Sequence, residues 1–193
     1  MQNQTWFNLV AVVTVLTVVG LGVATLVISP SPPATASAAT TPSAATVYRN
    51  LSIIYDPATG AYNYNVLNLG VPLNVRVVFT ITNYDTSTGL LPAASAAVVS
   101  GTYGGPMLMQ RGPSSVLTDQ LPTNDVSHTF SMSNGFYHLN VPIPPAASAS
   151  VPSQVTFSVV FTVPGTYTWG CVILCGSSSM GMPDQMYGPI TVS

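Results

Sequence analysis

The hydrophobic pattern of the sequence changes twice along the chain. Residues 9–28 form a continuous apolar stretch without a charged side chain, and residues 29–46 consist of Pro, Ser, Ala and Thr. From residue 47 onward, short runs rich in β-branched and aromatic residues are separated by turn residues. These patterns predict an N-terminal transmembrane anchor over residues 1–28, an extended linker over residues 29–46 and a folded domain over residues 47–193.

The apolar stretch is long enough to cross a membrane as one helix. At a rise of 1.5 Å per residue, about 20 helical residues span a bilayer core of roughly 30 Å. A cleaved signal peptide is the competing interpretation, but its apolar region would be shorter, and the start of this chain carries no Lys or Arg. We therefore expect a single-pass membrane protein held in the lipid bilayer.

The remainder of the chain has the pattern of short β-strands. Val75, Val77, Phe79 and Ile81 alternate with more polar residues, as on one face of a strand. Turn pairs such as Asp56-Pro57 and Pro164-Gly165 separate the runs. The predicted strands cover residues 47–55, 62–67, 73–82, 126–132, 155–163, 166–172 and 185–192. This pattern favours an all-β antiparallel sandwich.

Charged residues are scarce, which narrows the possible partners. They make up 4% of the chain, against about 25% in ordinary soluble proteins. Three arginines cannot supply the basic surface that a nucleic acid requires, so we expect no nucleic-acid partner. A surface of hydroxyls and amides has few groups that gain a proton at low pH, so its net charge stays nearly constant. Such a surface suits a protein that faces an acidic medium outside the cell. Glycosylation, for which Asn50-Leu51-Ser52 is a possible acceptor, and burial against partner subunits are alternative explanations.

The residues best suited to carry chemistry lie near the C-terminus. Both cysteines of the chain, Cys171 and Cys175, follow a predicted strand, and Met182 comes shortly after them. Thiolates and a thioether, together with an imidazole such as that of His128, form a ligand set that selects copper. The chain has neither a Gly-x-Ser-x-Gly nucleophile motif nor a Gly-rich phosphate loop.

Two short segments resemble cytochrome oxidase subunit II. The segment Asp125-Val126-Ser127-His128-Thr129-Phe130 is similar to that family's D-V-x-H-S-F, and the segment from Cys171 to Met182 is similar to its C-x-x-x-C-G-x-x-H-x-x-M loop. The resemblance implies a cupredoxin-like Greek-key sandwich with one N-terminal transmembrane helix. It also implies an extracytoplasmic, non-catalytic subunit that caps the haem-copper catalytic subunit of a terminal oxidase in aerobic respiration. Residues 84–124 have no counterpart in the family.

In that family the loop binds a dinuclear copper centre. The resemblance gives the metal-ligating positions of this chain as His128, Cys171, Cys175, Met182 and the carbonyl group of Ile173. Ser179 occupies the position of the family's second histidine. Because serine replaces imidazole poorly as a copper ligand, we expect a subunit of the quinol-oxidase type that has lost the copper and holds no cofactor. Haem would then lie in the partner subunit. In a copper-free protein, Cys171 and Cys175 could form a disulfide.

Three other interpretations stay open. The chain could be a copper-binding, electron-accepting subunit with an altered dinuclear site or a mononuclear site. A mononuclear site would need a second histidine, and His138 is the remaining candidate. The chain could instead be a surface-layer or filament protein without a redox role, or a free-standing membrane-tethered copper carrier.

Overall fold

The computed structural model describes residues 43–174 and 186–193. These residues form an all-β domain, and the one helical element among them is the short 3₁₀ helix η1 (Ala94–Ala97). The predicted all-β sandwich is confirmed. Strand β1 (Ser43–Asp56) begins within the segment predicted as linker. The predicted anchor over residues 1–28 lies outside the described residues.

Within the two described ranges, no helix is long and apolar enough to cross a bilayer.

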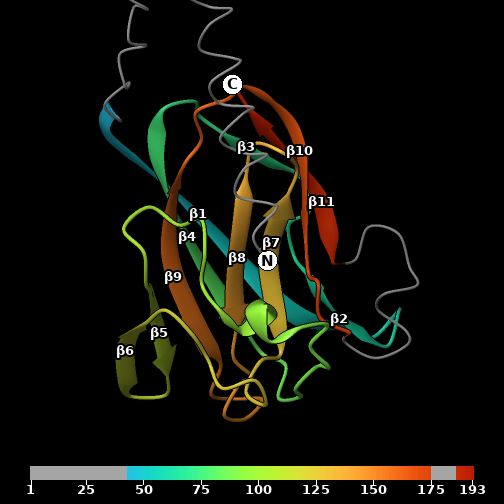
Figure 1. The fold of residues 1–193 in the computed structure, drawn as a ribbon. Helices are drawn as coiled ribbons and strands as arrows, with labels where there is room; N and C mark the ends of the chain where they lie inside the picture. The colour runs from blue at the N-terminus through green and yellow to red at the C-terminus, as the bar shows by residue number, and fades with distance from the viewer. Residues whose placement is uncertain (1–42, 175–185) are drawn as a thin grey trace, which may run out of the picture. The chain divides into compact units, whose positions relative to one another are not determined.

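The strands form two sheets that pack face to face (Figure 1). The six-stranded sheet has the order β2 (Ala61–Tyr64), β1, β4 (Val75–Asn83), β9 (Ser153–Val160), β5 (Met107–Arg111) and β6 (Ser114–Thr118). The five-stranded sheet has the order β3 (Leu69–Val71), β11 (Tyr187–Val192), β10 (Gly165–Gly170), β7 (His128–Ser133) and β8 (His138–Ile143). Strands β1 and β4 are parallel, whereas β4 and β9 are antiparallel. The chain passes between the two sheets repeatedly, so most spatial neighbours are not consecutive in sequence.

Aromatic side chains from both sheets fill the core between them. Every second residue of β4 is buried, and Phe79 meets Phe130 of β7 with ring centroids 5.3 Å apart. Phe130 stacks in turn on Trp169 of β10, with centroids 4.8 Å apart. His128 lies two residues before Phe130, and Cys171 lies two residues after Trp169. The aromatic contacts therefore fix the two strands that present the candidate ligands.

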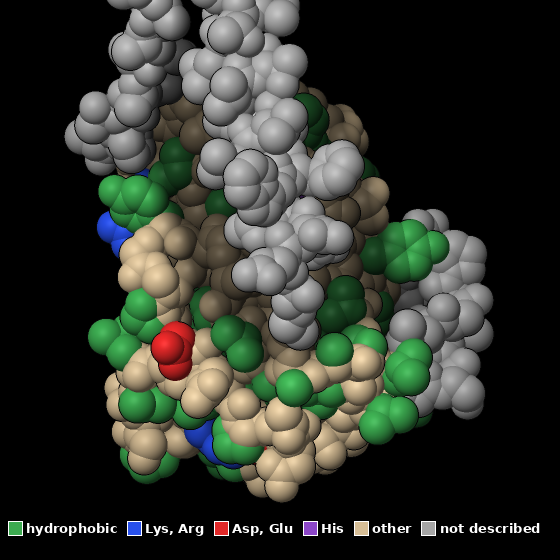
Figure 2. All heavy atoms as spheres, viewed as in Figure 1, with side chains coloured by type: hydrophobic (Ala, Val, Ile, Leu, Met, Phe, Trp, Pro, Cys, Tyr) green, Lys and Arg blue, Asp and Glu red, His purple; other side chains and the backbone are tan. Residues whose placement is uncertain are grey.

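The surface of the domain is poor in charge, as the composition predicts. Figure 2 shows one face on which Asp, Glu, Lys and Arg side chains are few. Of the three arginines, Arg49 donates hydrogen bonds to the carbonyl group of Gly70, and Arg111 forms an ion pair with Asp125 at 3.0 Å. Uncharged side chains and backbone therefore make up most of the described surface on this face.

Candidate metal centre

The structure brings three of the predicted ligand positions together at one end of the sandwich. The Nδ1 atom of His128 lies 4.0 Å from the Sγ atom of Cys171. The carbonyl oxygen of Ile173 lies 3.9 Å from the same sulfur. Cys175, Met182 and Ser179 fall outside the described residues. The cluster formed by His128, Cys171 and the Ile173 carbonyl is called the candidate centre below.

The backbone around Cys171 holds its sulfur against strand β7. The N–H group of Thr129 donates a hydrogen bond to Cys171 Sγ at 3.4 Å, and the N–H group of Cys171 donates to the carbonyl oxygen of Met186 at 2.8 Å. The second bond joins the two ends of the segment that follows β10. Gly170 is required beside it, because an added Cβ would lie 2.7 Å from the Cβ of Tyr187.

His128 has a buried acidic partner that the motifs do not indicate. Its Nε2 atom lies 2.9 Å from Oδ2 of Asp85, and the side chains of the two residues are only 1% and 8% exposed. Asp85 follows β4, so this contact joins the end of one sheet to the end of the other. A sequence signal for it exists: the alternation of β4 continues through buried Asn83 to buried Asp85. A carboxylate on a core-facing position requires a partner.

The contact between Asp85 and His128 shifts the pKa values of both side chains. Burial by itself raises the pKa of Asp85, but hydrogen bonds from His128 and from the N–H and hydroxyl groups of Ser87 outweigh it and bring the pKa below the usual 3.8. Burial by itself lowers the pKa of His128, but its hydrogen bond to Asp85 and its contact with Cys171 outweigh that effect and raise the pKa above 6.5. Each side chain thus favours the charged form of the other.

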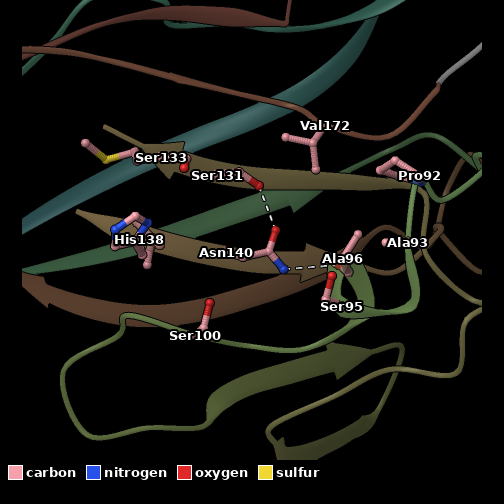
Figure 3. A pocket seen from close by; sticks show the side chains of 12 residues that line it. Pro92, Ala93, Ser95, Ala96, Ser100, Ser131, Ser133, His138, Asn140 and Val172 are labelled. Atoms are coloured by element: carbon pink, nitrogen blue, oxygen red, sulfur yellow. Dashed lines mark hydrogen bonds between the residues drawn. The ribbon is translucent and has the colours of Figure 1, made fainter. Parts of the chain in front are cut away.

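A second set of polar contacts supports the other face of β7. The N–H group of Val172 donates to Thr129 Oγ1 at 2.9 Å, and the hydroxyl oxygen of Ser131 lies 2.9 Å from the same atom. The Ser131 hydroxyl donates to Asn140 Oδ1 at 2.7 Å, and the Asn140 amide donates to the carbonyl oxygen of Ala96 at 3.1 Å (Figure 3). These bonds link the start of the segment after β10 (residues 171–174, called the cysteine segment below) to η1, along the lining of a hollow of about 290 Å³.

His138 lines this hollow and lies far from the candidate centre. In the pairing of β7 with β8, His138 is opposite Ser133, whereas His128 is opposite Ile143. Five strand residues separate the two histidine positions, which corresponds to roughly 16 Å. His138 is therefore too far from His128 to be the second histidine ligand of a mononuclear site.

The donor atoms of the candidate centre suit a soft metal ion. Metal–nitrogen and metal–sulfur bonds of about 2.0 and 2.3 Å together exceed the 4.0 Å between Nδ1 and Sγ, so one ion can reach both atoms. The hydrogen bond from Nε2 to Asp85 is the outer contact that metal-binding histidines usually make. In the part of the chain that the structure describes, no group of three or more His, Cys, Asp or Glu side chains is placed to hold a metal.

Comparisons with known proteins find weak similarity of this chain to solved structures and no similarity to curated protein sequences. No protein-family model and no curated protein sequence matches the chain. Reduced rusticyanin is similar with a TM-score of 0.41 and 17% identity, covering 78% of this chain and 81% of its own. Rusticyanin from Thiobacillus ferrooxidans is similar with a TM-score of 0.40 and 18% identity, covering 78% and 79%.

A multicopper oxidase from Campylobacter jejuni is similar with a TM-score of 0.41 and 9% identity, covering 76% of this chain but only 29% of that protein. Because all these TM-scores lie near 0.4, the fold given above rests on the strand order and not on these similarities.

Proposed function

We propose that the β domain is a cupredoxin-like copper-binding domain with a role in electron transfer, and that the chain is subunit II of a haem-copper terminal oxidase. The observation that carries the proposal is the 4.0 Å approach of His128 Nδ1 to Cys171 Sγ, with the Ile173 carbonyl beside them. These are three of the positions at which the resemblance to the oxidase subunit requires ligands. The residues lie on β7 and on the segment directly after β10, and these two strands are neighbours in the five-stranded sheet.

The residues that would hold copper are His128, Cys171, Cys175 and Met182, with the carbonyl group of Ile173. Copper bound there would accept and release one electron at a time. The chain itself supplies the fixed positions of the ligands. His128 is held by Asp85, and Cys171 is held by backbone bonds to Thr129 and Met186. Sites supported on strands in this way keep their geometry better than sites on loops alone.

A copper-free subunit of the quinol-oxidase type is the second candidate, and Ser179 is the observation that favours it. In that case the domain would cap the catalytic subunit on its extracytoplasmic side and stabilise the assembly through buried area. The buried pair of Asp85 and His128 would then serve the stability of the sandwich, and Cys171 and Cys175 could form a disulfide.

Metal analysis of the membrane-extracted complex, combined with haem spectroscopy, tests the proposal. Copper in stoichiometric amount, a visible absorption that disappears on reduction and co-purified haem would support it. Haem without copper would support the copper-free candidate. Neither haem nor copper in a correctly folded preparation would overturn both and favour a surface-layer or filament protein.

A His128→Ala variant provides the matched control for the metal. It should lose the visible absorption while the haem spectrum of the partner subunit stays unchanged. A His138→Ala variant removes the other imidazole of the chain, about 16 Å away along the strands, and should keep the absorption. Equal loss in both variants would contradict the assignment of His128 as a ligand.

A further inference from the structure

The buried imidazole of His128 has one nitrogen facing an acid and the other facing a sulfur. Nε2 lies 2.9 Å from Asp85 Oδ2, and Nδ1 lies 4.0 Å from Cys171 Sγ. An ionised carboxylate can only accept hydrogen bonds. In a neutral ring the proton must therefore lie on Nε2, which leaves the lone pair of Nδ1 directed toward the sulfur.

The carboxylate of Asp85 is itself held firmly in place. Its Oδ1 atom accepts hydrogen bonds from the N–H group of Ser87 at 2.8 Å and from the Ser87 hydroxyl at 2.7 Å. Its backbone N–H group donates to the side-chain oxygen of Asn83 at 3.0 Å, and its carbonyl oxygen accepts from Ala146 at 2.7 Å. The side chain of Asp85 is only 8% exposed, so water has little access to compete for the ring of His128.

We propose that Asp85 is a positioning residue of the candidate centre, which makes Nδ1 of His128 the metal-binding atom and stabilises the oxidised form of a bound copper through its negative charge. This inference rests on the proposed copper-binding function. Carboxylate partners fix the orientation of ligating histidines and raise the basicity of the ring. A negative charge on the far side of the ring favours the more positive oxidation state, so Asp85 should lower the reduction potential of the centre.

The tautomer of His128 can be measured in the unaltered 193-residue chain without metal. Nitrogen-15 spectra of the histidine rings, recorded with the cysteines reduced and at a pH where the rings are neutral, distinguish a proton on Nε2 from one on Nδ1. We expect His128 to carry its proton on Nε2, while exposed His138 shows the averaged signals of a free ring. A proton on Nδ1 of His128 would overturn the inference, whatever the behaviour of any variant.

Copper titration of two variants tests the role of the charge. Asp85→Asn keeps the size of the side chain and removes its charge, and Asp119→Asn makes the same change at an exposed position. We expect Asp85→Asn to bind copper 10- to 100-fold more weakly, and its bound copper to have a higher reduction potential. Asp119→Asn should match the unaltered chain in both measurements.

The outcomes separate this inference from the proposed function. Copper binding by the unaltered chain with equal affinity and potential in Asp85→Asn would overturn the role of Asp85 and leave the copper-binding proposal standing. No copper binding by the unaltered chain would overturn both. If Asp85→Asn fails to fold, the nitrogen-15 spectra of the unaltered chain decide the matter.

Discussion

At the scale of single residues, the pair of Asp85 and His128 is unusual for a chain with so few charges. Removing a carboxylate and an imidazole from water is costly, and it is tolerated only when the pair is fully hydrogen-bonded. Here Asp85 receives bonds from His128 and Ser87. Loss of one partner should therefore cost much more than loss of an exposed histidine.

We predict that His128→Ala lowers the unfolding free energy of the metal-free protein by about 3–5 kcal/mol, because it leaves the Asp85 carboxylate buried without its partner. His138→Ala should change it by less than about 0.5 kcal/mol, since that side chain is exposed. Urea denaturation of the two variants measures both values. Equal stability of the two variants would show that the buried pair makes no net contribution.

The same pair predicts a pH dependence of stability for the metal-free protein. The pKa of His128 is raised above 6.5 in the folded state, so its contribution is complete below pH 6.5 and is lost as the pH rises through the raised pKa. The pKa of Asp85 is lowered below 3.8, so its contribution is complete above pH 3.8 and is lost as the pH falls through the lowered pKa. Unfolding should therefore require more urea near pH 5 than near pH 8.

The His128→Ala variant is the control for this pH dependence. Without the imidazole, the loss of stability between about pH 5 and pH 8 should shrink clearly. An unchanged pH profile in the variant would assign the dependence to other groups, such as the thiol of Cys171, which faces the same ring.

The residues of the candidate centre differ in how far the sequence can predict them. His128, Cys171 and Ile173 follow from short motifs whose internal spacing is fixed, and the structure brings them together. Asp85 lies 43 positions from His128, and no spacing rule connects residues on two different sheets. The buried alternation of β4 indicates that Asp85 faces the core, but only the packing of the sheets shows which side chain it meets.

At the scale of secondary-structure elements, the segment after β4 lies tightly against the cysteine segment. The N–H group of Gly89 donates to the carbonyl oxygen of Val126, and Leu90 and Leu174 pair as an isolated bridge. A Cβ added at Gly89 would collide with the side chain of Ile173 and lie 3.2 Å from the Ser127 carbonyl oxygen. Glycine is therefore needed here for close approach.

We predict that Gly89→Ala destabilises the domain by about 1–3 kcal/mol, as overpacking of a tight contact usually does, and weakens copper binding by displacing Ile173. Gly70→Ala is the matched control, because nothing lies within 4 Å of a Cβ at that position. Urea denaturation and copper titration of both variants provide the measurements. Similar copper affinities in the two variants would mean that the cysteine segment does not depend on this contact.

Strands can be predicted from the sequence where hydrophobic and polar residues alternate strongly. The strength of this alternation depends on how deeply one face of the strand is buried. Each predicted run overlaps an observed strand, with β4 and β9 as the clearest examples, because the inner face of β9 and that of β4 from Val77 onward are buried. Strand β8 was not predicted, since it contains Pro142 and begins with two polar positions out of three. Proline is tolerated there because β8 is an edge strand. Strand β6 is exposed along nearly its whole length, and β5 alternates only weakly, with Met107 as its one buried residue.

At the scale of the whole molecule, the candidate centre connects the two sheets. Asp85 follows β4 of the six-stranded sheet. His128 is the first residue of β7 in the five-stranded sheet, and Cys171 directly follows β10 of the same sheet. The aromatic contact of Phe79 with Phe130 joins the same sheets in the core. A ligand held at the centre would therefore stabilise the packing of one sheet on the other and not only a local loop.

This arrangement predicts that copper raises the melting temperature of the entire domain. A ligand at 100 times its dissociation constant adds about 2.7 kcal/mol, which corresponds to a rise of about 5–11 °C for a domain of this size. The rise should be absent in His128→Ala and unchanged in His138→Ala. Differential scanning calorimetry with and without copper measures it, and a shift of the same size in His128→Ala would place the bound metal away from the junction of the two sheets.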